Sequence, residues 1–206
     1  MRQRNVGIFV FEDVEVLDFA GPFEVFNVTA ELNDPAPFNV YTIAETSAPI
    51  KTRGALRIHP NYPMTAAPQA DILIVPGGAG TRPLLKKPHV IDWLRTVSGA
   101  TELLCSVCTG SMVLGKAGLL DGLVATTHHE NFDDLRAIVG DKVTIVDDTR
   151  YTVNDGVLTS GGISAGIDMS LYLVRELLGD AVLARTLAVM EYDWTPDTSL
   201  RWKPTA

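Results

Sequence analysis

The run Asp-Ile-Leu-Ile-Val at 71–75 constrains the fold more than any other part of this sequence. It is apolar without the alternation of a strand that has one face in water. Such a run is expected of a strand buried on both faces of a parallel sheet that helices cover. The sequence therefore predicts a central strand here.

Other short β-rich runs alternate with longer helical patterns along almost the whole chain, which is typical of an α/β protein. We expect strands at 6–11, 38–44, 71–75 and 101–107, and helices at 22–32, 90–97, 110–120 and 132–139. Two more helices are predicted near the C-terminus by apolar residues at 4-3-4 spacing. Their stripes are Ile167, Leu171, Val174 and Leu178, and then Leu183, Leu187, Met190 and Trp194.

Asn154-Asp155-Gly156 separates two β-rich runs, 151–153 and 157–159. This predicts a hairpin with a type I′ turn, and so some antiparallel pairing beside the parallel strands. No linker or repeat divides the 206 residues, and we expect one domain, 1–206, in which 195–206 is a polar tail.

Composition and charge exclude several classes of protein. With 46% apolar and 20% charged residues, the chain has the make-up of an ordinary globular protein. Seventeen basic against 25 acidic residues give a net charge of −8, which repels nucleic acid. No apolar run approaches the roughly 18 residues of a membrane span, and the apolar run at 6–11 has no cleavage site after it. Because only two cysteines are present, we expect the reducing cytoplasm.

Cys108 stands where the apolar run 103–107 meets a turn of small residues and a predicted helix. A side chain on such a sharp turn projects from the carboxyl edge of the sheet, where open α/β proteins bind ligands. The N–H groups and dipole at a helix N-terminus favour the nucleophilic thiolate. A buried structural thiol is the alternative, and the strand-turn-helix placement favours the nucleophile.

Cys105 and Cys108 also spell C-x-x-C, a spacing found in redox and zinc sites. If Cys105 lies within the strand, three residues at about 3.3 Å each put the two positions about 10 Å apart, which is too far for a disulfide. Nothing nearby completes a zinc site. We therefore expect Cys105 to pack in the core and no metal to be bound.

Asp18 lies at 17–22, between the first predicted strand and the first predicted helix. Asp is a preferred helix cap and Pro22 suits a first helical turn, so capping is the simple interpretation. However, this loop opens at the same sheet edge as the Cys108 turn, so carboxyl and thiol can meet. Two anions would repel there. We expect the pair to share one proton and to titrate as a coupled pair.

The segment 75–80, at the end of the buried strand, contains three glycines. They allow the backbone N–H groups of Gly77 and Gly78 to approach a ligand closely, as in an oxyanion hole. Their spacing is not that of a dinucleotide-binding loop. A second small-residue turn at 159–164, which contains Ile163, precedes another helix and is a candidate to line the same edge.

Two adjacent histidines, His128 and His129, follow another short strand. Ordinary polar packing is the simpler interpretation of both.

Four segments together resemble the ThiJ/PfpI superfamily and, within it, the isocyanide (isonitrile) hydratases. They are Leu17-Asp18-x-x-Gly21-Pro22, Pro76-Gly77-Gly78, Ser106-Val107-Cys108-Thr109-Gly110 and Thr126-Thr127-His128. The likeness continues through 161–168 to a helix ending at Glu191-Tyr192, so it covers nearly the whole chain. Thr109 stands where the peptidase-like branch carries His after its cysteine, which argues against proteolysis.

The resemblance implies a flavodoxin-like α/β fold of the class I glutamine amidotransferase-like type. This is a three-layer sandwich whose mostly parallel central sheet has helices on both faces. The resemblance also implies a homodimer, no cofactor, and a small-molecule isocyanide as the partner rather than nucleic acid or membrane.

The predicted reaction is hydration of an isocyanide to an N-substituted formamide, a lyase reaction. The resemblance implies that Cys108 is the nucleophile and that Asp18 is its acid partner. The hydroxyl of Thr109 is a candidate to orient Asp18. Candidates to bind the substrate or developing charge are Gly77, Gly78, Ile163 and the N–H of Thr109.

Two alternatives use the same thiol. One is a redox- or ligand-sensing domain without catalysis, related to the sensor halves of AraC-type regulators. Such regulators append a helix-turn-helix, and because only about a dozen residues follow Trp194, we do not expect DNA binding. The other is a glyoxalase- or deglycase-like enzyme that acts on reactive carbonyls. Product formation from an isocyanide or from methylglyoxal separates the three.

Overall fold

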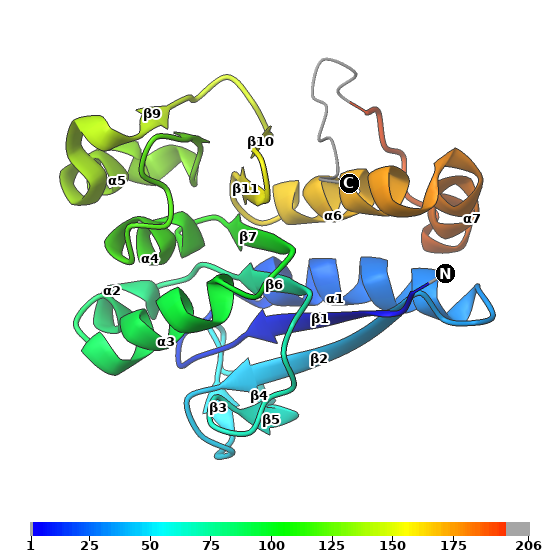
Figure 1. The fold of residues 1–206 in the computed structure, drawn as a ribbon, viewed down its shortest axis with the longest axis horizontal. Coiled ribbons are helices and arrows are strands. Elements are labelled where there is room, and N and C mark those ends of the chain that lie inside the picture. Colours follow the sequence, from blue (N-terminus) through cyan, green and yellow to red (C-terminus); the bar gives the residue numbers. More distant parts are fainter. Residues whose placement is uncertain (1, 197–206) are drawn as a thin grey trace.

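A computed structural model describes residues 2–196, and its centre is a seven-stranded sheet (Figure 1). In spatial order the strands are β10 (Tyr151–Val153), β11 (Val157–Ser160), β7 (Leu103–Val107), β6 (Ile72–Val75), β1 (Arg4–Phe9), β2 (Phe38–Ala44) and β5 (Tyr62–Pro63). Every neighbouring pair is parallel except β10 with β11. The predicted mostly parallel sheet is confirmed.

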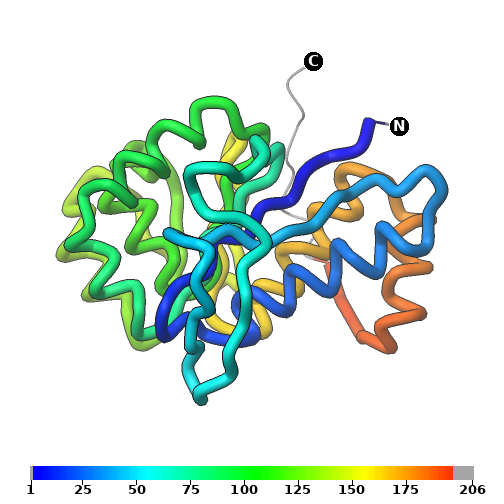
Figure 2. Tube along the Cα trace, turned by 90° about the horizontal axis from the view of Figure 1, so that it is seen from below, coloured from blue at the N-terminus to red at the C-terminus, as the bar shows by residue number. Residues whose placement is uncertain are grey.

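Helices cover both faces of this sheet. On one face, α1 (Val16–Glu31) packs against α6 (Ala165–Leu178) and α7 (Asp180–Met190). On the other face lie α2 (Thr81–Leu84), α3 (Pro88–Ser98), α4 (Gly110–Lys116) and α5 (Phe132–Val139). Figure 2 shows the strands between these two helical layers. The expected three-layer sandwich is therefore confirmed.

Short elements extend the loops. They are β3 (Ile50–Lys51), β4 (Arg57–Ile58), β8 (Val124–Ala125), β9 (Thr144–Ile145) and two 3-10 turns at His129–Asn131 and Gly140–Lys142. β3 and β4 form an antiparallel pair, whereas β8 and β9 pair in parallel.

The central strand β6 has the burial that its apolar run predicts. All four of its residues are buried, and Leu73 and Ile74 are 1% and 0% exposed. From β1 the chain crosses to β2 on one side and later returns to β6 on the other side. Open α/β sheets bind ligands at such a reversal, beyond the carboxyl ends of the strands.

The first helix begins earlier in the chain than the sequence predicts. α1 begins at Val16, so the predicted start at residue 22 is wrong and Pro22 lies inside the helix. The reason for the error is that proline is common in a first helical turn but is tolerated later when packing outweighs one lost hydrogen bond. Asp18 consequently lies in the first turn of α1, not in a loop.

Several other boundaries also differ. α4 ends at Lys116 rather than 120, just before Gly118, which has a positive φ of 74°. α7 ends at Met190, so Trp194 lies beyond the helix that its spacing predicted. β1 ends at residue 9 and β7 begins at residue 103, two residues inside the predicted limits.

The predicted hairpin is confirmed as the antiparallel pair β10 and β11. A type I′ turn needs positive φ at both central residues, and in this described turn only Gly156 has one. The predicted turn type is therefore wrong.

Candidate active site

Cys108 occupies the sharp turn between β7 and α4, as its sequence context predicts. Its φ is +57°, a left-handed conformation that is uncommon for a residue with a side chain. The Cys108 N–H donates to the carbonyl oxygens of Ser160 and Gly161, both at 3.1 Å, and these bonds hold the turn. The residue is 7% exposed, so little of it is open to solvent.

Asp18 is completely buried beside this turn, with 0% of its surface exposed. One carboxylate oxygen accepts the N–H of Gly77 at 3.0 Å, and the other accepts the N–H of Ile163 at 3.0 Å. Gly77 follows β6, and Ile163 lies between β11 and α6. One side chain therefore joins three segments at the carboxyl edge of the sheet.

The thiol of Cys108 donates a hydrogen bond to Asp18. Burial raises the pKa of Asp18 to about 6, although the two backbone N–H groups and the thiol oppose this. Burial, and then the charge of Asp18, raise the pKa of Cys108 to about 12. The hydrogen bond from the backbone N–H of Thr109 acts in the opposite direction and lowers this pKa. Both pKa values are raised, so near neutral pH the pair holds one proton between the carboxylate and the sulfur.

This result corrects one expectation. The helix N-terminus was expected to favour the thiolate, yet the pKa of Cys108 is raised because burial outweighs the donors. The thiolate can form only if Asp18 accepts the proton. The predicted meeting of carboxyl and thiol is confirmed.

Thr109 serves the glycine turn rather than Asp18. Its hydroxyl oxygen accepts the N–H of Gly78 at 3.0 Å and lies 3.2 Å from the hydroxyl of Thr81. The prediction that this hydroxyl orients Asp18 is therefore wrong. The N–H groups of Gly77 and Gly78 are both paired within the protein, so neither one serves as a free oxyanion donor in this structure.

A cavity of about 220 Å³ opens above Cys108. Its lining residues are Glu15, Arg53, Gly78, Ala79, Arg82, Cys108, Thr109, His128, Glu130, Asn131 and Ile163. Of the predicted site residues, Cys108, Thr109, Gly78 and Ile163 line it, whereas Asp18 and Gly77 lie behind the wall.

The sequence did not indicate the two arginines of the cavity. Arg53 comes from the turn between β3 and β4 and forms an ion pair with Glu15 at 2.6 Å. An isolated arginine in a short hairpin gives no signal in a sequence. Arg82 pairs with Asp134 at 2.9 Å, and its position two residues after Gly80 places it near the glycine turn.

His128 lines the cavity, and its ring packs so closely that a side chain at Gly162 would lie 2.2 Å from it. Burial and the neighbouring His129 lower the pKa of His128, so its ring is neutral at neutral pH.

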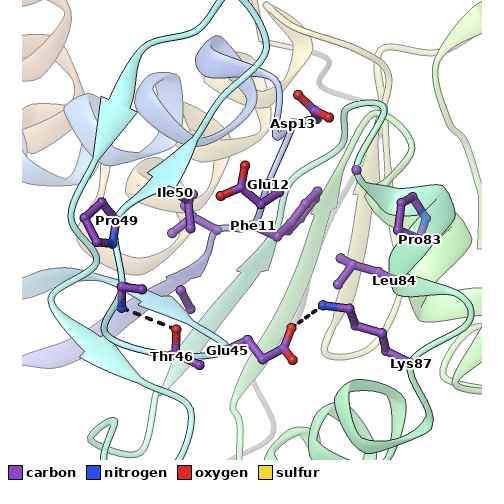
Figure 3. A pocket seen from close by; sticks show the side chains of 14 residues that line it. Phe11, Glu12, Asp13, Glu45, Thr46, Pro49, Ile50, Pro83, Leu84 and Lys87 are labelled. Atoms are coloured by element: carbon purple, nitrogen blue, oxygen red, sulfur yellow. Dashed lines mark hydrogen bonds and ion pairs between the residues drawn. The ribbon is translucent and has the colours of Figure 1, made fainter.

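A second cavity, of about 320 Å³, is lined by residues from the segments that follow β1, β2 and β6 (Figure 3). Phe11, Ile50 and Leu84 form apolar parts of its wall, and an ion pair of Glu45 with Lys87 stands at its rim. Cys108 lines the smaller cavity and no cysteine lines the larger one, so we place the chemistry in the smaller one.

Cys105 is fully buried within β7, and neither cysteine forms a disulfide. Within residues 2–196 no group of three or more metal-ligating side chains comes together. The same residues contain no helix that is long and apolar enough to cross a membrane.

Comparisons with known proteins agree with this geometry. Residues 4–176 match the DJ-1/PfpI family. Isonitrile hydratase of Pseudomonas putida is 37% identical over 197 residues, which are 93% of this chain and 79% of that protein. The transcriptional regulator GbdR of Pseudomonas aeruginosa is 27% identical over 92% of this chain, and the match spans only 51% of the regulator.

Solved structures show the same fold. A ThiJ/PfpI family protein from Pseudomonas syringae superimposes with a TM-score of 0.84 and 26% identity, over 96% of this chain and 78% of that one. DJ-1beta of Drosophila melanogaster superimposes with a TM-score of 0.80 and 18% identity, over 94% of this chain and all of that one.

Proposed function

The chain belongs to the DJ-1/PfpI family, and from that premise we propose that it hydrates an isocyanide to an N-substituted formamide. The 37% identity to an isonitrile hydratase supports the substrate class. The observation that carries the chemistry is the hydrogen bond from the buried thiol of Cys108 to the carboxylate of Asp18.

In the first step Asp18 accepts the proton of the Cys108 thiol, and the sulfur attacks the terminal carbon of R–N≡C. Asp18 then gives the same proton to that carbon. The product is a covalent thioimidate, R–N=CH–S–Cys, and the carboxylate is regenerated. The raised pKa of Asp18, about 6, suits a group that both accepts and donates a proton near neutral pH.

In the second step water adds its oxygen to the thioimidate carbon, and its proton passes through Asp18 to nitrogen. The resulting R–NH–CH(OH)–S–Cys collapses as the carbon–sulfur bond breaks and the hydroxyl proton returns to sulfur. One isocyanide and one water thus give one formamide, and the thiol is restored.

Asp18 is suited to these transfers because its orientation is fixed. The N–H groups of Gly77 and Ile163 each bind one oxygen of the carboxylate. These two hydrogen bonds hold the carboxylate of Asp18 beside the sulfur of Cys108. Holding a proton acceptor in reacting geometry removes much of the entropic cost of the step.

The test is turnover of an aryl isocyanide by wild type, Cys108→Ala and Asp18→Asn, with formamide measured by chromatography. We expect both variants to lose at least about a hundredfold, since each removes a group that transfers a proton or forms the bond. Cys105→Ala is the matched control, because it deletes the other thiol, which is fully buried in β7.

Full turnover by Cys108→Ala would overturn the proposal. If folded, reduced wild type gives no formamide but forms lactate from methylglyoxal, the carbonyl-directed alternative replaces it. We also propose a homodimer acting in the cytoplasm without a cofactor, and light scattering on the purified protein tests the dimer.

A further inference from the structure

The loop 161–164 reaches Asp18 through one contact, the N–H of Ile163. Ile163 has a φ of +58°, which is strained for a β-branched residue, and its side chain is 39% exposed. The side chain of Ile163 is therefore too exposed to hold its own backbone in this conformation by burial. Contacts at the two ends of the loop must do so.

Arg150 contacts both ends. Its carbonyl oxygen accepts the N–H of Gly161 at 2.9 Å. Its guanidinium donates to the hydroxyl of Ser164 at 3.1 Å and to the carboxylate of Asp168. Arg150 precedes β10, so one residue outside the loop fixes the residues on either side of Ile163.

Asp168 anchors this arrangement from the first turn of α6. It is 6% exposed, and its other oxygen accepts the hydroxyl of Tyr192 at 3.0 Å. Tyr192 lies in the segment after α7. Three separate segments therefore meet on one buried carboxylate next to the loop.

We propose that Arg150, Asp168 and Tyr192 are positioning residues for the catalytic pair, because they hold the loop 161–164 so that Ile163 donates to Asp18. This inference rests on the proposed function of Asp18 and Cys108. None of the three touches the thiol, and only their hold on the loop links them to it.

The alternative is an ordinary ion pair that contributes a little stability. The side chain of Arg150 is 54% exposed, and exposed pairs of this kind contribute little. The two interpretations differ in what they predict for Asp18. A hydrogen bond to its ionised form favours that form, so a loosened loop raises the pKa of Asp18, whereas loss of a surface ion pair leaves it unchanged.

The test is the rate at which iodoacetamide alkylates Cys108 between pH 5 and 9, followed by intact mass. This readout needs no isocyanide, so it remains valid even if the hydratase proposal fails. The thiol becomes nucleophilic when Asp18 loses its proton and can accept that of sulfur, so wild type should show an inflection near pH 6.

We expect Arg150→Met to move this inflection upward by about one pH unit, since complete loss of a hydrogen bond to a charged group would move it by roughly one to two. Isocyanide turnover should fall about tenfold in kcat with KM nearly unchanged, because the proton acceptor and not the cavity wall is displaced. Arg150→Lys keeps the charge but can reach only one of the two partners. Its inflection and its kcat should therefore lie between those of wild type and Arg150→Met.

Arg136→Met is the matched control, because it removes an exposed ion pair with Asp133 on α5, outside the site. If Arg150→Met is folded and keeps the wild-type inflection, the proposal is overturned. Should Arg150→Met fail to fold, Tyr192→Phe removes one hydroxyl and must produce a smaller shift in the same direction. An unchanged inflection in Tyr192→Phe would then overturn the proposal.

Discussion

At the scale of single residues, the site depends on how one carboxylate is buried. Asp18 has no exposed surface, and two backbone N–H groups only partly compensate for the loss of water. Its pKa is therefore raised to about 6 rather than lowered. The folded protein holds a proton there more tightly than the unfolded chain does.

This difference makes the free energy of unfolding depend on pH. The stabilisation by the Asp18 proton is fully present below pH 3.8 and is lost as pH rises through about 6. We expect the free energy of unfolding of wild type, minus that of Asp18→Asn, to fall by about 1 kcal/mol between pH 5 and pH 8. Urea unfolding of both proteins at the two pH values measures it. A difference that stays constant or rises with pH would contradict the raised pKa.

Cys108 and Asp18 could be predicted from the sequence, because a strand-turn-helix pattern and chain order alone bring them to one sheet edge. The partner of the Thr109 hydroxyl could not, since a hydroxyl binds whichever backbone group packing places beside it. Arg53 gave no signal either, because its place at the cavity depends on how the hairpin of β3 and β4 folds back.

At the scale of elements, the turn between β7 and α4 depends on close backbone packing. A Cβ at Gly110 would lie 2.0 Å from the carbonyl oxygen of Val75, and one at Gly77 would lie 2.6 Å from the N of Thr109. The ends of β6 and β7 therefore approach each other more closely than residues with side chains permit.

Gly110→Ala should accordingly destabilise the protein by about 3 kcal/mol and abolish turnover, since backbone must move to admit the methyl group. Gly99→Ala is the matched control. Gly99 has a φ of −65°, and its Cβ would meet nothing closer than 3.6 Å. Its effect should stay within about 0.5 kcal/mol. Denaturant unfolding measures both, and equal stabilities for the two variants would contradict the packing argument.

The extent of α1 shows what local patterns miss. Pro22 indicated a start at residue 22, but α1 begins at Val16, because Phe19 and Phe26 bury one side of a longer helix against the sheet and α6. Tertiary packing outweighed a local signal, whereas the helix at 132–139, with no proline, was predicted at its observed bounds.

At the scale of the whole molecule, one sheet holds the site together, since loops after β1, β6, β7 and β11 each contribute to it. The spatial order of those strands could not be predicted from the sequence. Patterns identify strands but not which ones lie side by side, although the parallel arrangement and central β6 followed from its unbroken apolar run.

A single domain should unfold in a single step. Trp93 packs on Phe9 with ring centroids 5.0 Å apart, so its fluorescence reports on the core beside β1. We expect tryptophan fluorescence and far-ultraviolet circular dichroism to give coincident urea transitions. Ile74→Ala should lower the free energy of unfolding obtained from both signals by about 3 kcal/mol. Val189→Ala, at a residue 56% exposed, should change neither value by more than about 0.5 kcal/mol. Two separate transitions would contradict one domain.

The contacts of Asp18 also bear on when the site forms. Its two backbone donors lie 59 and 145 positions away along the chain, so both must arrive before the carboxylate is oriented. Contacts between such distant residues form slowly, because long loops must close first. During synthesis or refolding, helices and strands therefore exist before the catalytic pair does. Until the segment after β11 has docked, Asp18 lacks one of its two backbone donors, so the catalytic pair is completed only late in folding.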